Sequence, residues 1–209
     1  MTHSSRPELL TLHAVRLLGF ADTAAITRRY CMDPARTAAL LEDFQVRGWV
    51  ERAAFADLAG WSLRESGRQE NERRLAAELD QVGAGDEVRA VYRDFLPLNT
   101  RLQKACTRWQ LRPTPGDPLA VNDHSDPAWD DAVLDELAAI HRGLTPLAER
   151  LGGSLTRFRS YDPRFAAALQ QAWRGDGGWV DRTDLDSCHR VWFELHEDLI
   201  ATLGLVRHP

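Results

Sequence analysis

The sequence predicts a mainly α-helical protein with two domains: a small N-terminal domain that carries a short β-ribbon, and an all-helical C-terminal bundle. Capping residues and glycines follow one another closely in residues 22–67, which indicates short helices and a ribbon there. Beyond residue 86, apolar residues recur at three- and four-residue steps, as in amphipathic helices. Two glycines within residues 82–87 mark the boundary, so the predicted domains are residues 1–82 and 83–209.

Three helices are expected before the ribbon, and each is opened by a residue type that favours a helix start. The expected ranges are residues 7–19, 23–31 and 34–47. The start signals are Pro7, Asp22 and the pair Asp33-Pro34. Gly48 suits the end of the third helix, because glycine readily adopts the left-handed conformation that closes a helix.

Strand signals follow the third helix. Residues 50–55 and 61–63 should pair as an antiparallel ribbon around the turn Asp57-Leu58-Ala59-Gly60. A further helix should open at Ser66-Gly67 and run to about residue 79. This order of helix, turn, helix and ribbon is that of a winged helix-turn-helix. Such a fold most often places one helix in the major groove of DNA.

The same segment supports a resemblance to a known family. The stretch ITRRYCMDPARTAALLEDFQVRGWV resembles the two-helix core of MarR-type winged-helix regulators, and WSLRESGR resembles their second wing strand and following helix. The resemblance covers the N-terminal third of the chain only. It implies a homodimeric transcriptional regulator that binds double-stranded DNA and reads its bases with the third helix.

Carried over by position, the resemblance gives a set of expected DNA contacts. The base-reading face would hold Ala35, Arg36 and Thr37, followed by two more alanines. Of these, Arg36 and Thr37 have side chains that can hydrogen-bond to base edges. The expected phosphate contacts are Arg28, Arg29, Arg52 and Arg64.

Charge limits how strongly such a surface could bind. The formal net charge of the chain is −5, and residues 1–80 hold 11 arginines against 12 aspartates and glutamates. Contact with DNA must therefore come from a local patch of arginines, because no general positive field attracts the polyanion. We expect modest, salt-sensitive binding.

Four helices and one long loop are expected in the C-terminal domain. The helices should cover residues 86–110, 127–150, 162–174 and 184–203. The Pro-rich stretch 112–127 should be a loop, longer than most connections in compact domains. The simplest architecture is a helical bundle that binds an effector, dimerises, or does both.

Aromatic residues and histidines are the candidate ligand-binding groups of the bundle. They are Trp109, Trp129, Tyr161, Trp179, His189, Trp192 and His196. Aromatic side chains line many small-molecule pockets, although they serve equally well as core and interface residues. His189 and His196 share a helix face but stand two turns apart, about 10 Å, so one metal could not join them without a third element. No metal or cofactor is predicted.

Composition narrows the class of protein. The chain is 44% hydrophobic and 27% charged, without a long apolar run or a secretion signal, which favours a cytoplasmic protein with no membrane partner. Its three cysteines are widely spaced, so we expect them to be buried and unpaired.

The sequence also holds no catalytic signature, so we do not expect an enzyme. The leading hypothesis is a transcriptional regulator with a small-molecule effector. One alternative is a winged-helix protein-interaction module without sequence-specific DNA binding. The other alternative is a metal-dependent helical-bundle protein.

Overall fold

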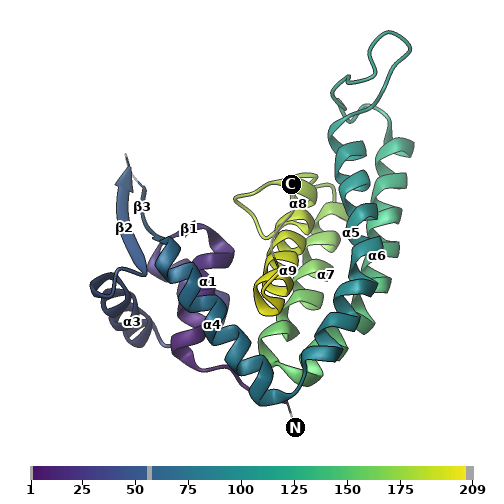
Figure 1. The fold of residues 1–209 in the computed structure, drawn as a ribbon. Coiled ribbons are helices and arrows are strands. Elements are labelled where there is room, and N and C mark those ends of the chain that lie inside the picture. Colours follow the sequence, from purple (N-terminus) through teal and green to yellow (C-terminus); the bar gives the residue numbers. More distant parts are fainter. Residues whose placement is uncertain (1, 56–57, 206–209) are drawn as a thin grey trace. The chain divides into compact units, whose positions relative to one another are not determined.

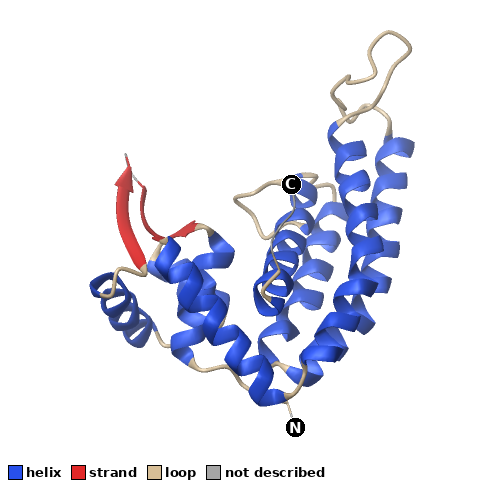
Figure 2. Ribbon diagram, in the orientation of Figure 1, coloured by secondary structure: helices blue, strands red, loops and turns tan. Residues whose placement is uncertain are grey.

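The computed structural model describes residues 2–55 and 58–205 of the chain. These residues are mainly helical and include one three-stranded antiparallel sheet (Figures 1 and 2). The chain divides into two compact units. The first comprises Met1–Asp86, Ser154–Arg157 and His196–Pro209, and the second comprises Glu87–Gly153 and Phe158–Leu195.

Three short helices open the first unit, as the capping residues predicted. They are α1 (Pro7–Leu18), α2 (Thr23–Arg29) and α3 (Pro34–Val46). The Asp22 carboxylate accepts a hydrogen bond from Ala25 N at 2.6 Å, and the Asp33 carboxylate accepts one from Arg36 N at 2.7 Å. Both starts are therefore confirmed as capped N-termini. Helix α2 ends two residues earlier than expected, and Cys31 in the turn after it has a left-handed backbone with φ 51°.

The sheet has the order β1-β3-β2, with all neighbours antiparallel. Its strands are β1 (Phe20–Ala21), β2 (Val50–Phe55) and β3 (Leu58–Leu63). The predicted ribbon is confirmed, but its turn is wrong: Leu58 to Gly60 belong to β3, while Asp57 lies outside the described residues. Gly60 is needed inside the strand because a Cβ there would lie 2.8 Å from the ring of Phe20 in β1.

Helix α4 (Glu65–Val82) follows the sheet, and its first turn packs closely on Trp49, in the turn between α3 and β2. A Cβ at Gly67 would lie 2.0 Å from the carbonyl oxygen of Trp49, so only glycine fits this approach. The same oxygen accepts a hydrogen bond from Arg64 N at 2.9 Å. The Ser66-Gly67 signal thus marks a close contact between α4 and the residue before β2, as well as a helix start.

Apolar side chains from the first three helices and the sheet form one core. Buried members include Leu12, Ile26, Leu41, Phe44 and Val50. At its edge, the buried indole of Trp61 donates a hydrogen bond to Thr23 Oγ1 at 3.0 Å, which ties β3 to the start of α2. The sheet and the helix pair α2–α3 are therefore held against α1 by a shared apolar contact.

A buried polar cluster occupies another part of the first unit. It consists of His13, Glu78, Arg157, Asp198 and Thr202, which we call the Arg157 cluster. The guanidinium of Arg157 donates to Glu78, to Asp198 at 3.3 Å and to Thr202 at 2.8 Å, while His13 Nε2 lies 3.0 Å from Asp198 Oδ1. Burial alone would raise the pKa of the Asp198 carboxyl, but the charges of His13 and Arg157 hold that pKa below its usual range.

The second unit is mainly helical, and the predicted loop between its first two helices is present over residues 111–126. Its elements are α5 (Gly85–Gln110), α6 (Pro127–Ser154), the 3-10 helix η1 (Thr156–Ser160), α7 (Tyr161–Trp173), α8 (Gly178–Asp181) and α9 (Cys188–Leu203). Some residues at the ends of α5, α6 and η1, and the second half of α9, belong to the first unit. Helices α5 and α6 run side by side (Figure 1), joined by ion pairs such as Arg101–Glu136 at 2.7 Å.

The starts of α7 and α9 differ from the predicted ones. Helix α7 begins at Tyr161, one residue before the predicted range, and the Asp162 carboxylate in its first turn accepts a hydrogen bond from Thr145 Oγ1 at 2.8 Å. Helix α9 begins at Cys188, where the predicted range began at residue 184. Ser187 explains this boundary, since its hydroxyl accepts a hydrogen bond from Arg190 N at 3.2 Å as a helix cap does.

Trp192 is the centre of the second unit's core. Its ring stacks on Phe95 with centroids 4.8 Å apart and meets the edge of Phe165 at 5.8 Å. Its indole nitrogen donates to Asn99 Oδ1 at 2.9 Å, so the buried polar atom is satisfied. Among the described residues, no helix combines the length and apolar character that a membrane crossing requires.

The cysteines follow the prediction in part. Cys106 and Cys188 are buried and unpaired, and burial raises the pKa of the Cys106 thiol to about 12, which makes it unreactive. Cys31 was expected to be buried and is exposed, because it occupies the turn between α2 and α3.

Candidate nucleic-acid interface and ligand pockets

Helices α2 and α3 pack together across a four-residue turn that follows Arg29. The turn is fixed by a hydrogen bond from Met32 N to Thr27 O at 3.0 Å. The exposed side of α3 presents a mixture of small, basic and acidic residues: Ala35, Arg36, Ala39, Glu42 and Asp43. Most of this side is thus small or acidic, as the sequence indicated.

Arg36 is the polar residue on this side best placed to reach a base. Its side chain is 56% exposed, and its guanidinium lies 2.9 Å from the carboxylate of Glu8 in α1. The pKa of Glu8 is lowered by a hydrogen bond from its own backbone amide and by Arg36. Exposed pairs of this kind contribute little free energy, so a phosphate or a base could take the place of Glu8.

Two residues that the sequence assigned to DNA have buried side chains. Thr37 is 1% exposed, and its hydroxyl donates to the carbonyl oxygen of Asp33 at 2.9 Å. Arg29 is buried as well, with its guanidinium 4.6 Å from the centre of the Tyr30 ring. Because neither side chain faces solvent, the prediction that Thr37 and Arg29 contact DNA is wrong for this structure.

The exposed arginines around α3 divide into paired and unpaired groups. Arg64 lies 3.1 Å from Glu51, and Arg47, which the sequence analysis did not single out, lies 2.7 Å from Asp43. Arg28 and Arg52 are exposed, and neither makes an ion pair with a residue that the structure describes. These two residues are therefore the strongest candidates for phosphate contacts.

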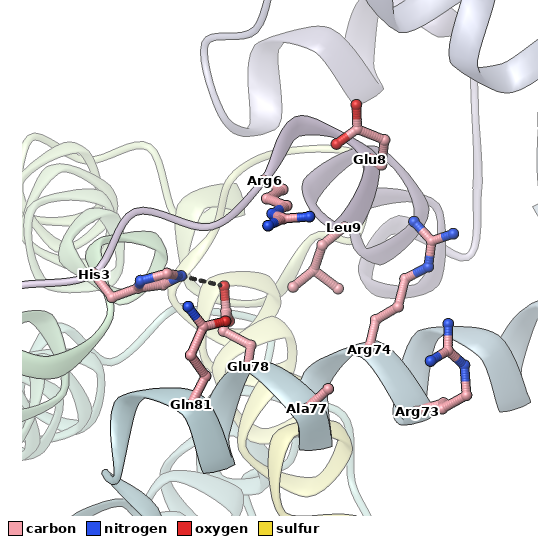
Figure 3. A pocket seen from close by; sticks show the side chains of 9 residues that line it. All are labelled: His3, Arg6, Glu8, Leu9, Arg73, Arg74, Ala77, Glu78 and Gln81. Carbon is pink, nitrogen blue, oxygen red and sulfur yellow. Dashed lines mark ion pairs between the residues drawn. The ribbon is translucent and has the colours of Figure 1, made fainter.

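A pocket in the first unit lies between the start of α1 and the last turns of α4. Its volume is about 400 Å³, and Figure 3 shows the residues that line it. Its acids already have partners: Glu8 pairs with Arg36, and Glu78 pairs with Arg157 and with His3 at 3.4 Å. With charges of both signs on its walls, this pocket favours no particular class of ligand.

A second pocket, of about 650 Å³, lies in the second unit among α5, α6, α7 and α8. Trp109, one of the predicted ligand-binding residues, forms part of its wall. Trp173 and three aspartates also line it, and the sequence analysis did not predict these residues. We call it the Trp109 pocket.

The other candidate ligand residues lie elsewhere. Tyr161 and Trp192 are core residues, and the indoles of Trp129 and Trp179 donate to Arg108 O and to the Asp176 carboxylate. His189 and His196 are partly exposed on α9. His189 belongs to the second unit, whereas His196 belongs to the first unit.

The metal-dependent alternative gains no support from the arrangement of side chains. Within residues 2–55 and 58–205, no group of three or more histidine, cysteine, aspartate or glutamate side chains is arranged to hold a metal ion.

Comparison of the chain with models of known protein families, with curated proteins and with solved structures finds no match.

Proposed function

We propose that the first unit is a winged helix-turn-helix that binds double-stranded DNA through α3, and that the protein is a transcriptional regulator. One observation carries the proposal: the elements follow the order α1-β1-α2-α3-β2-β3, with β1 paired to β3 next to the α2–α3 pair. A helix pair followed directly by a ribbon presents one helix and one wing to a duplex.

The proposed contacts divide by role. Arg28 on α2 and Arg52 on β2 neutralise phosphates, because both are exposed and have no acidic partner among the described residues. Arg36 leaves Glu8 and reaches a base edge, with Ala35 and Ala39 as apolar neighbours. In a homodimer, two copies of α3 would read half-sites about 34 Å apart. Such a regulator would act in the cytoplasm.

Replacing Arg28 and Arg52 together by alanine should weaken binding to a labelled duplex of random sequence. Each lost phosphate contact should reduce the slope of log affinity against log salt concentration by about 0.9. Fluorescence anisotropy over a salt series measures both quantities. The control is Arg93→Ala, which removes an exposed arginine from α5 in the second unit. An unchanged slope in the double variant would refute these phosphate contacts.

A second candidate function is protein recognition by the same face. It is favoured by Val46 at the end of α3, which is 88% exposed and lies near the exposed acids Glu42 and Asp43. An apolar side chain among acids suits a basic protein partner better than a phosphate backbone. If the wild-type chain fails to bind any duplex at low salt, this reading replaces the first.

A further inference from the structure

We propose that the Trp109 pocket of the second unit binds a small organic cation, one with an ammonium, amidinium or guanidinium group on an apolar body. The cavity measures about 650 Å³, which is in the size range of pockets that enclose drug-sized molecules. The proposal rests on the lining of this cavity alone and holds whether or not the first unit binds DNA.

The chemistry of the lining selects a positive charge. Two indoles, Trp109 and Trp173, line the cavity together with the carboxylates of Asp130, Asp131 and Asp181. None of the described lining residues is arginine or lysine. The basic side chain in the wall is His124, which lies 2.9 Å from Asp130, so Asp131 and Asp181 have no basic partner within the wall. The face of an indole attracts cations and its surface accepts an apolar body, while carboxylates repel anions.

The wall around Trp109 is fixed before any ligand arrives. A Cβ at Gly177 would lie 2.8 Å from the Trp109 ring, so the glycine lets the main chain rest against the indole. The His124 ring also lies 4.6 Å from the Trp109 ring, centroid to centroid. The buried amide of Asn122 donates to Trp109 O at 3.0 Å and to Asp130 at 2.9 Å. A wall held in this way loses little entropy on binding.

The carboxylates differ in what they can offer a ligand. Asp130 is held by Asn122 and by His124 Nδ1 at 2.9 Å, and Asp181 accepts a hydrogen bond from Gln110 at 2.8 Å. Asp131 is exposed in the first turns of α6 and is the carboxylate best placed to pair with an incoming cation. Trp173, the last residue of α7, is 44% exposed and lines the cavity, so its ring is accessible to a ligand.

Isothermal titration calorimetry on the full chain tests this inference with benzamidine, an aromatic cation, and with benzoate, an anion of similar shape. We expect saturable binding of benzamidine and none of benzoate. Asp131→Asn and Trp173→Ala should each weaken benzamidine binding by about tenfold. Asp135→Asn is the matched control, because Asp135 lies one turn further along α6, is exposed, and does not line the cavity.

Circular dichroism confirms that each variant is folded before titration. Saturable benzamidine binding that only the two pocket variants weaken supports the inference. Equal binding of benzoate, equal affinity in Asp131→Asn and Asp135→Asn, or no saturation by benzamidine up to about 1 mM overturns it.

Discussion

Replacing Arg157 by methionine is expected to lower the free energy of unfolding by about 3–5 kcal/mol. The guanidinium is fully buried and donates to Glu78, Asp198 and Thr202, which come from α4 and α9. Without it, two carboxylates remain in the interior with too few partners, and that penalty exceeds the loss of the Coulomb attraction itself. Urea unfolding followed by circular dichroism measures the change.

An exposed arginine provides the control for this experiment. Among the described residues, the ion-pair partner of Arg182 is Asp184, two residues further along the chain. Arg182→Met should therefore leave the urea midpoint unchanged. The double variant Arg157→Met/Asp198→Leu should recover part of the loss, because one of the stranded charges is removed as well. If Arg157→Met is as stable as Arg182→Met, the Arg157 cluster does not hold the first unit together.

Trp192→Ala is expected to destabilise the second unit by about 3–5 kcal/mol. The side chain is 2% exposed and fills the space between Phe95 and Phe165, so its removal leaves a large cavity. The substitution also removes the hydrogen bond of 2.9 Å that the indole nitrogen donates to Asn99 Oδ1. Urea unfolding measures this loss as well.

Trp173→Ala is the matched control, since it makes the same chemical change at a ring that is 44% exposed. We expect a much smaller effect on stability there, because little packing is lost and no buried cavity forms. Equal destabilisation by the two substitutions would show that Trp192 is not the centre of this core.

Local sequence signals predicted much of the fold, because they act within a few residues. Asp22, Asp33 and Gly48 each set a helix end through contacts with their own neighbours, and the structure has those ends where they were expected. Strand β1 escaped prediction because two residues show no periodicity. Its pairing with β3 brings Phe20 against Gly60, forty residues away, and local signals at Gly60 predicted a turn instead.

The candidate sites were harder to predict, because burial and distant partners decide them. Thr37 and Arg29 have the right chemistry for DNA, but the packing of α2 and α3 turns both side chains inward. In the second unit, Trp109 was identified by its residue type alone. Its partners Trp173 and Asp181 come from α7 and α8, and only the tertiary fold brings these elements to one cavity.

The central claim is that α3 reads a DNA sequence, and selection from a pool of random duplexes tests it most directly. Wild-type protein and the Arg36→Ala variant are each used to enrich the pool at low salt, and the recovered duplexes are sequenced. We predict that wild type enriches an inverted repeat with half-sites about one helical turn apart, and that Arg36→Ala loses this preference while retaining salt-sensitive, non-specific binding. Recovery of no preferred sequence by the wild-type chain, or of the same sequence by both proteins, would contradict the claim.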